Sequence, residues 1–254
     1  MKKVIPKIAA IIQARMGSTR LPGKVLMNIG DETILARVVR RLSRSKLIDE
    51  ILVATTTSRP DDAIVEECER LRVRWFRGSE YDVLDRYCRA AEAASVDIIV
   101  RITADCPLID CALVDQVLRA FFERNADFAC NVLPRTYPRG LDTEVFTRDA
   151  LAKVVDQADQ PYQREHVTPV FYERRDVFRF ATVTAERDYS HYRWTVDTSE
   201  DLEFVRSIYS RFDNRDDFGW GAAIELLEFS PELAMLNAHV QQKEAGPTVG
   251  NTTS

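Results

Sequence analysis

Apolar runs typical of buried strands alternate with helical stripes through the first half of the chain. Runs of three to five apolar residues occupy positions 8–12, 51–54 and 98–100, and a shorter strand pattern occupies positions 73–76. Each run is followed by a segment whose apolar residues recur every three or four positions. Continuous apolar runs suit strands covered on both faces. The alternation therefore predicts an α/β fold with a mostly parallel, doubly wound sheet.

The pattern indicates one domain over residues 1–244, followed by a disordered tail at 245–254 that is rich in Gly, Pro, Thr and Ser. Between about 133 and 190 the alternation loosens, and we interpret this stretch as an excursion from the main fold. Three element predictions bear on function. We expect a helix over 32–44 capped by Asp31, a helix over 163–173, and a strand over 192–197.

A basic loop follows the first apolar run. Residues 14–24 read ARMGSTRLPGK and contain three cations, two glycines and no acid. A glycine-containing loop at the carboxyl end of a first strand is where open α/β sheets bind phosphates, because backbone N–H groups reach the anion and cations balance its charge. The loop is neither a G-x-x-x-x-G-K-[ST] nor a G-x-G-x-x-G motif. A plain turn is the alternative interpretation.

The composition argues against some classes of binding partner. The 254 residues carry a formal charge of −5, which gives no global attraction to nucleic acid or to anionic membranes. No apolar run reaches the roughly 20 residues of a membrane span, and the first residues do not resemble a signal peptide. The five cysteines form no C-x-x-C pair, which favours a reducing cytoplasm, and the three histidines lack zinc-ligand spacing.

Two carboxylates are expected at the edge of the sheet where the basic loop lies. Asp105 and Asp197 each follow a predicted strand and precede a predicted helix. Mg²⁺ prefers one or two carboxylates together with phosphate oxygens and water, so the pair is a candidate metal site. The alternatives are structural, with Asp105 as a turn residue before Pro107 and Asp197 as a helix cap. No Ser-His-Asp spacing or reactive-cysteine context indicates covalent catalysis.

These motifs together resemble the cytidylyltransferases that activate acidic sugars, and most of all their spore-coat-polysaccharide-type branch. The matching stretches are the basic loop, DVLDRY at 82–87, RITADCP at 101–107, GLDTEVF at 140–146, REHVT at 164–168 and WTVDTSEDL at 194–202. The resemblance spans about residues 7 to 240. It implies a single nucleotide-diphospho-sugar-transferase-like, Rossmann-like domain of three layers. It also implies that the protein is a cytoplasmic homodimer and that it acts in surface polysaccharide or glycan biosynthesis.

The resemblance also implies roles for individual residues. Arg15, Lys24 and Arg20 would be catalytic, holding the phosphates of CTP and stabilising the departing pyrophosphate. Asp105 and Asp197 would hold Mg²⁺. The nucleotide would lie against Gln13, Ala14, Gly17, Ser18, Arg86 and Thr103. A small acidic acceptor would lie against Asn131, Arg139, Asp142, Glu144, Arg164 and His166.

Two departures from related patterns bear on the substrate. The L-x-G-G-x-G-x-R loop of hexose-1-phosphate nucleotidyltransferases is absent, which disfavours hexose phosphates. Ala104 stands where the acidic-sugar enzymes usually carry Gly before the first metal-binding Asp. A glycosyltransferase of the related nucleotide-sugar fold is the main alternative, although no suitably placed D-x-D pair is present. A catalytically silent nucleotide-binding subunit is the third hypothesis.

Overall fold

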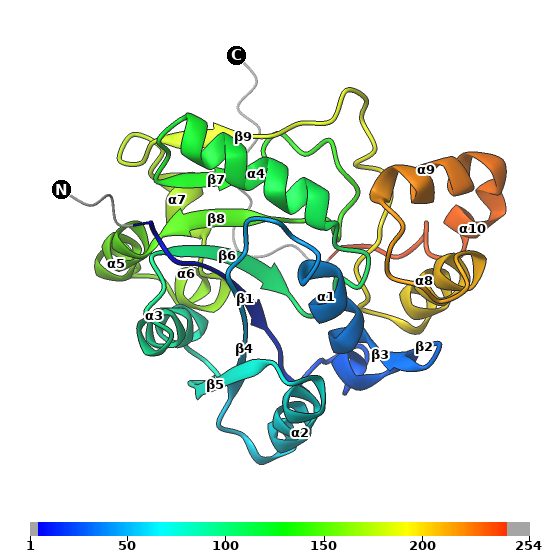
Figure 1. Cartoon of the computed structure of the whole chain (residues 1–254), viewed down its shortest axis with the longest axis horizontal. Coiled ribbons are helices and arrows are strands. Elements are labelled where there is room, and N and C mark those ends of the chain that lie inside the picture. The colour runs from blue at the N-terminus through cyan, green and yellow to red at the C-terminus, as the bar shows by residue number, and fades with distance from the viewer. Residues whose placement is uncertain (1–4, 243–254) are drawn as a thin grey trace.

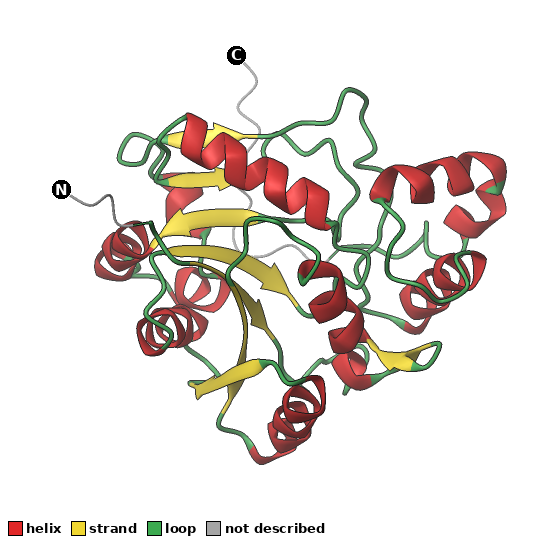
Figure 2. Ribbon diagram, viewed as in Figure 1, coloured by secondary structure: helices red, strands yellow, loops and turns green. Residues whose placement is uncertain are grey.

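The computed structural model describes residues 5–242, so the predicted tail lies outside the described residues. The strands of the fold are β1 (Ile8–Gln13), β2 (Asn28–Ile29), β3 (Glu32–Thr33), β4 (Glu50–Thr56), β5 (Arg74–Gly78), β6 (Ile98–Thr103), β7 (Phe128–Cys130), β8 (Glu144–Thr147) and β9 (Phe180–Thr182). Seven of them form one sheet in the order β5-β4-β1-β6-β8-β7-β9, and β2 with β3 forms a separate ribbon (Figure 2). The predicted α/β fold with a mostly parallel sheet is confirmed.

The sheet is parallel from β5 to β6 and at the β7–β9 pair, whereas β8 runs antiparallel to both its neighbours. Residues 133–190, predicted as an excursion, contribute β8 and β9 to this same sheet. The register of β1 with β6 places Gln13 beside Thr103 at the carboxyl edge. The ends of these two central strands therefore define the floor of any site at that edge.

Helices cover both faces of the sheet. They are α1 (Ile34–Leu42), α2 (Asp62–Leu71), α3 (Val83–Ala93), α4 (Cys111–Glu123), α5 (Arg148–Gln157), α6 (Pro161–His166), α7 (Pro169–Glu173), α8 (Ser199–Arg211), α9 (Trp220–Phe229) and α10 (Pro231–Met235), with two 3₁₀ turns, η1 (Lys24–Leu26) and η2 (Arg59–Asp61). Figure 1 shows α3, α5 and α6 on one side of the sheet and α1 and α4 on the other. The molecule therefore has the expected three layers.

Successive residues of β1 supply the two halves of the core. Ala10 and Ile12 pack with α1 and α4, whereas Ala9 and Ile11 pack with α3 and α5. Because both faces of β1 are covered, its five apolar residues run without a polar interruption.

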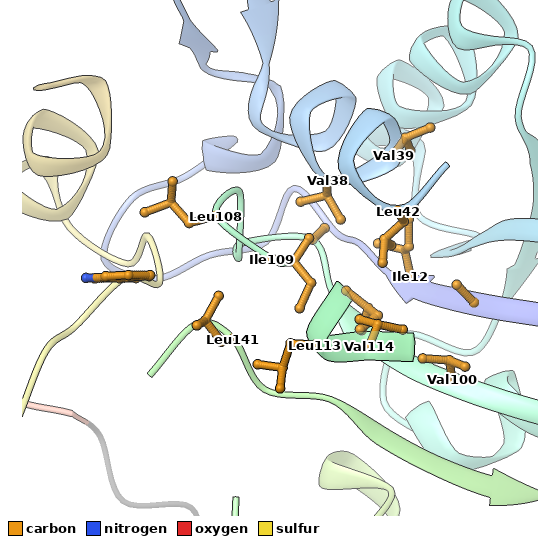
Figure 3. Close-up of a cluster of buried hydrophobic side chains, with 14 of the residues drawn as sticks. Ile12, Val38, Val39, Leu42, Val100, Leu108, Ile109, Leu113, Val114 and Leu141 are labelled. Atoms are coloured by element: carbon orange, nitrogen blue, oxygen red, sulfur yellow. The ribbon is translucent and has the colours of Figure 1, made fainter. Parts of the chain in front are cut away.

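The connection after β6 is anchored in the first of these halves. Leu108 and Ile109 lie among side chains of α1 and α4, and Leu141 joins the same cluster from the loop before β8 (Figure 3). Full burial of a leucine or isoleucine side chain contributes about 1.5–3 kcal/mol to the stability of the fold. The segments that carry Asp105 and Asp142 are therefore anchored in the hydrophobic core by these neighbouring side chains.

The first predicted helix begins later than expected. Thr33, not Asp31, is the N-cap of α1, because its hydroxyl oxygen accepts a hydrogen bond from the N–H of Ala36. Glu32 and Thr33 are instead paired with β2. At the start of α8, Thr198 and Asp201 form a capping box, whereas Ser58 makes no side-chain cap at the start of η2.

Two further predictions near the site are wrong. Residues 163–173 do not form one helix, since α6 ends at His166 and α7 begins at Pro169. Proline interrupts the helix because it cannot donate the backbone hydrogen bond and because it restricts the conformation of the residue before it. Residues 192–197 are not a sheet strand, and within residues 5–242 their one bridge joins Arg193 to Arg139. Both edges of β6 are already occupied, by β1 and β8.

Over residues 5–242, no helix combines the length and apolar character that crossing a membrane requires.

Candidate active site

A polar cavity of about 600 Å³ lies at the carboxyl edge of the sheet. Most of the residues predicted from sequence line it: Gln13, Ala14, Arg15, Gly17, Ser18, Arg20, Lys24, Thr103, Asp105, Arg139, Asp142, His166 and Asp197. Two smaller chambers adjoin it and share wall residues with it. One measures about 280 Å³ and includes Glu144, and the other measures about 200 Å³ and includes Arg86.

The basic loop is fastened at both of its ends. The buried carboxylate of Asp61 accepts a hydrogen bond from the N–H of Met16 at 2.8 Å and further bonds from the end of β4. The carbonyl of Met16 in turn accepts hydrogen bonds from the N–H groups of Ser18 and Gly23. These bonds fold the loop back on itself, so that Lys24 follows directly after the turn and enters the cavity wall.

Lys24 joins the two predicted metal-binding carboxylates. Its ammonium lies 2.7 Å from Asp105 Oδ2 and 2.7 Å from Asp197 Oδ1, and it also donates to the carbonyl of Val196 at 2.7 Å. Only 9% of the Lys24 side chain is exposed, so these charge-assisted bonds are shielded from water. The two aspartates, 92 positions apart in sequence, therefore converge on a single cation position.

Asp197 is surrounded by two further cations. Its Oδ2 atom lies 2.7 Å from Arg20 and 2.6 Å from Arg193. Arg193 is itself held by the fully buried Asp201, which also accepts hydrogen bonds from the N–H groups of Asp197 and Thr198. Asp197 is thus oriented by its neighbours, and Thr198, not Asp197, is the N-cap of α8. The helix-cap alternative for Asp197 is wrong.

Backbone hydrogen bonds carry the segment 192–197 to the site in place of sheet pairing. The N–H of Val196 donates to the carbonyl of Asp105 at 2.8 Å, and Arg139 exchanges hydrogen bonds with Tyr192 and Trp194. This close approach requires glycine at position 140. Gly140 has φ +112°, and a Cβ there would lie 2.6 Å from the backbone carbon of Trp194.

We expect Gly140→Ala to destabilise the fold by about 2–4 kcal/mol, because a Cβ would push the segment carrying Asp197 away from Asp105. Urea unfolding measures this change. Gly221→Ala is the matched control, since nothing lies within 4 Å of its added Cβ in α9, and alanine there should stabilise by about 0.5–1 kcal/mol. Equal effects at the two positions would contradict the packing argument.

The charges shift one another's pKa values. Burial alone lowers the pKa of Lys24, but Asp105 and Asp197 outweigh it, so the pKa lies above its usual 10.5. Burial alone raises the pKa of Asp197, but Lys24, Arg193 and Arg20 outweigh it and hold the pKa below 3.8. Both groups are charged at neutral pH, which is the state that a bridge requires.

Two arginines on the cavity wall have no carboxylate partner within residues 5–242. Arg15 is exposed on the basic loop, and Arg139 is half-buried in the loop before β8. Burial and the nearby charges of Arg135 and Arg193 lower the pKa of Arg139. Cations gathered without matching acids create a positive field that favours an anionic ligand.

The 280 Å³ chamber opens beside Arg101, Thr103 and Asp142, which it shares with the main cavity. Its walls hold two ion pairs. Arg101 donates to Glu144, which also accepts from the hydroxyl of Tyr172, and Arg135 makes a two-point bond to Asp142. Both ion pairs fix charged side chains on the chamber wall, and the Nε atom of Arg101 is buried without a hydrogen bond.

The 200 Å³ chamber lies between the loop after β1 and α6. Two of its wall residues carry buried polar atoms that make no hydrogen bond, the Oε1 acceptor of Gln13 and the Nε donor of Arg86. Buried polar groups are normally paired, so an unpaired acceptor and an unpaired donor on two residues that line one chamber make this chamber a candidate ligand site.

Two predicted acceptor residues lie away from these three cavities. Asn131 is buried and braces the neighbouring loop, donating to the carbonyl of Leu141 and accepting from the N–H of Thr143. Arg164 pairs with Asp82, the N-cap of α3. Their predicted contact with an acceptor stays a prediction.

Sequence reasoning did not single out Arg101 and Arg193 as site residues. Arg101 carried a usable signal, because a charged residue inside a buried strand run has to be paired. Arg193 carried no local signal, since its importance comes from Asp197 and Asp201 lying around it in space.

Asp105 and Asp197 fit a Mg²⁺ ion that completes its shell with phosphate oxygens and water. They already face one cation position, which the Lys24 ammonium occupies. No cluster of three or more metal-ligating side chains exists among residues 5–242, so the protein alone does not form a full cage. This matches the preference of Mg²⁺ for few carboxylates and a substrate phosphate.

A three-layer α/β domain with a basic loop, paired carboxylates and unpaired arginines at one sheet edge defines a nucleotidyltransferase-type protein. The cytidylyltransferase family model matches residues 9–242. The chain is 42% identical over 241 residues to an uncharacterised protein of Methanocaldococcus jannaschii, covering 93% of this chain and 97% of that one. It is 34% identical to the spore coat polysaccharide biosynthesis protein SpsF of Bacillus subtilis, covering 89% and 96%.

A solved structure of a cytidylyltransferase from Leptospira borgpetersenii superposes with a TM-score of 0.88 at 39% identity, covering 94% of this chain and all of that chain. The chain belongs to the cytidylyltransferase family, as the resemblance of its motifs predicts, and is an enzyme of that class.

Proposed function

We propose that the protein transfers CMP from CTP to a small acidic acceptor and releases pyrophosphate, with Mg²⁺ as cofactor. The observation that carries this proposal is the position of Lys24 between Asp105 and Asp197, on a wall that also holds the unpaired Arg15 and Arg139. A triphosphate needs cations, and nucleotidyl transfer needs charge stabilisation and positioning rather than a protein nucleophile.

The residues of the basic loop act on the triphosphate. Arg15 has its charge free to bind phosphate oxygens, and Arg20 and Lys24 stabilise the negative charge that develops on the leaving pyrophosphate. Asp105 and Asp197 hold the metal ion. Bound there, Mg²⁺ supplies Lewis-acid stabilisation of the phosphoryl charge. The bracing of Asp197 by Arg193 and Asp201 keeps its carboxylate in position.

The 200 Å³ chamber fits the nucleobase. It is smaller than a typical pocket for a whole ligand, so it takes one part of a nucleotide. Cytosine offers an amino donor and neighbouring acceptors, which complement the Oε1 acceptor of Gln13 and the Nε donor of Arg86. Uracil carries an acceptor where cytosine carries the amino group, and it would meet Gln13 Oε1 with like polarity.

We expect Gln13→Leu to reduce kcat/KM with CTP by about 10–100-fold and to lower the preference for CTP over UTP, because the acceptor for the amino group is lost. Gln13→Glu keeps an oxygen acceptor and is expected to keep the preference. Parallel assays with CTP and UTP measure both ratios. If Gln13→Leu leaves the preference for CTP over UTP unchanged, Gln13 does not recognise the base.

The acceptor fits the side of the cavity formed by Arg139, Asp142 and the 280 Å³ chamber. Arg139 is free to bind a carboxylate, and Asp142 and Glu144 offer acceptors for hydroxyl groups. SpsF is by its name a protein of spore coat polysaccharide biosynthesis, which supports a sugar acid destined for a surface glycan.

The test is to incubate the protein with CTP, Mg²⁺ and a panel of sugar acids, hydroxy acids and phosphorylated acids, with pyrophosphate release and mass spectrometry of CMP adducts as readouts. A CMP adduct of any acid supports the proposal. Hydrolysis of a nucleotide sugar without adduct formation would favour a glycosyltransferase. Tight, metal-independent CTP binding without turnover would favour a silent binding subunit. Light scattering tests the predicted homodimer.

A further inference from the structure

His166 lies on the wall shared by the main cavity and the 200 Å³ chamber. It is the last residue of α6, and its ring is half-buried and makes no hydrogen bond with the residues that the structure describes. The charged groups around it are Glu165 on its own helix, Arg15 on the basic loop, Arg101 on β6 and Arg86 on α3. The imidazole therefore shares the wall of the main cavity with Arg15 and Arg101, whose charges act on it.

An unusual turn sets this position. Val167 has φ 70° and ψ −52°, and the N–H of Thr168 donates to the carbonyl of His166 at 2.8 Å, which is a γ-turn. A β-branched residue in this region costs about 1–3 kcal/mol and persists only where the surroundings hold it. Val167 is fully buried against the core of the α3 side, which supplies that support. The turn ends α6 at the cavity wall, whereas the continuous helix expected from sequence would run past it.

The transfer reaction releases one proton, from the hydroxyl of the acceptor. The acids on the walls already have partners, because Asp105 and Asp197 bind Lys24, Asp142 binds Arg135 and Glu144 binds Arg101. Glu165 is exposed to solvent.

The other two histidines of the chain do not line any of the three cavities. His191 lies against Tyr192, with ring centroids 4.1 Å apart, and His239 lies beyond α10. Within residues 5–242, His166 is the cavity side chain whose ordinary titration range includes neutral pH.

We propose that His166 is the general base that takes the proton of the acceptor hydroxyl as its oxygen attacks the α-phosphorus of CTP. The inference rests on the proposed function. The O–H bond breaks and an N–H bond forms on the imidazole, while the new O–P bond forms. The bond from the α-phosphorus to the pyrophosphate oxygen breaks, and its electron pair leaves with pyrophosphate. The imidazolium then returns its proton to water.

The electrostatics agree with this role. Burial and the charges of Arg101 and Arg15 lower the pKa of His166 below 6.5 against the opposing charge of Glu165, so the free enzyme holds a neutral imidazole at pH 7. Binding of a triphosphate at Arg15 brings negative charge close to the ring. That charge raises the pKa towards neutrality, where a base is most effective.

The first test is independent of the acceptor. With three histidines in the chain, the imidazole signals are assigned by single His→Asn variants and titrated by NMR. Adding a non-hydrolysable α,β-methylene analogue of CTP with Mg²⁺ is expected to raise the pKa of His166 by about 0.5 or more while leaving His191 unmoved. A His166 pKa that does not move would overturn the proposal, because the ring would then lie away from the phosphates.

The second test compares His166→Asn with His191→Asn in turnover. His166→Asn is expected to lower kcat by about 10²-fold, to change the CTP dissociation constant by less than about fivefold, and to lose the acid limb of the profile of kcat/KM against pH. His191→Asn should match the wild type. A His166→Asn enzyme that retains the acid limb and its kcat contradicts the role. If the wild type forms no CMP adduct with any acid, the proposed function fails and the general-base role fails with it, and a shifted His166 pKa then shows only that the ring lies near the bound triphosphate.

Discussion

Lys24→Met is expected to lower kcat by about 10³-fold and, at the same time, to strengthen binding of Mn²⁺ in the absence of nucleotide. The ammonium of Lys24 now lies 2.7 Å from Asp105 and from Asp197, where it competes with any divalent cation for both carboxylates. Without it, two like charges face an empty position and attract a metal ion more strongly. Turnover is lost all the same, because the cation that stabilises the departing pyrophosphate is missing.

Steady-state assays measure the loss of turnover, and calorimetry or electron paramagnetic resonance measures Mn²⁺ binding. Lys153→Met on the exposed face of α5 is the matched control, since it removes the same charge away from the cavities. Weaker Mn²⁺ binding by Lys24→Met would show that Lys24 supports the metal site rather than occupying it.

The same variant changes how stability depends on pH. The folded-state pKa of Lys24 is raised, so its bridge contributes fully below about pH 10.5 and the contribution disappears as pH rises through the folded value. The folded-state pKa of Asp197 is lowered, so its contribution is present above about pH 3.8 and disappears as pH falls through the folded value. Lys24→Met should unfold at lower urea concentration than the wild type at pH 8, and it should lack the decline in stability at alkaline pH that we expect of the wild type.

Asp105→Asn is the second change with a large expected effect. It should lower kcat by about 10³-fold, because metal-assisted charge stabilisation contributes several kcal/mol and an amide is a poor ligand for Mg²⁺. Its fold should remain intact. The Asp105 side chain accepts hydrogen bonds from Lys24 and Cys106 and caps no helix, since α4 is capped by Asp110.

Asp110→Ala is expected to show the opposite behaviour to Asp105→Asn, with lower stability and unchanged turnover. Its carboxylate accepts hydrogen bonds from the N–H groups of Leu113 and Trp220, so the variant should lose about 1–3 kcal/mol of stability and keep its turnover. Urea unfolding and steady-state assays of both variants separate catalysis from capping. An Asp105→Asn enzyme that turns over normally but unfolds early would restore the view that Asp105 is a turn residue.

The central fold and the phosphate edge follow from local patterns. Strand β4 contains the apolar run at 51–54, and the apolar run of β1 leads into the basic loop as expected, because burial on both faces leaves a continuous apolar signature. The end of β6 places Asp105 at the same edge by the geometry of parallel strands. Most of the candidate site residues lie on one cavity for this reason.

Other features of the site could not be predicted from any short stretch of the sequence. Asp197 reaches Lys24 from a segment held by isolated backbone bonds to Asp105 and Arg139, although a sheet strand was expected there. Similarly, Arg101 meets Glu144 across the β6–β8 pair, 43 positions along the chain.

By itself, then, the sequence determined which residues could bind phosphate, nucleotide and metal, because strand periodicity and turn composition are short-range properties. The tertiary structure alone decided which charges pair with one another and which remain free for a ligand. Coulomb interactions depend on distance in space, and residues separated by 81 and 173 positions are brought to hydrogen-bonding distance only by the packed core.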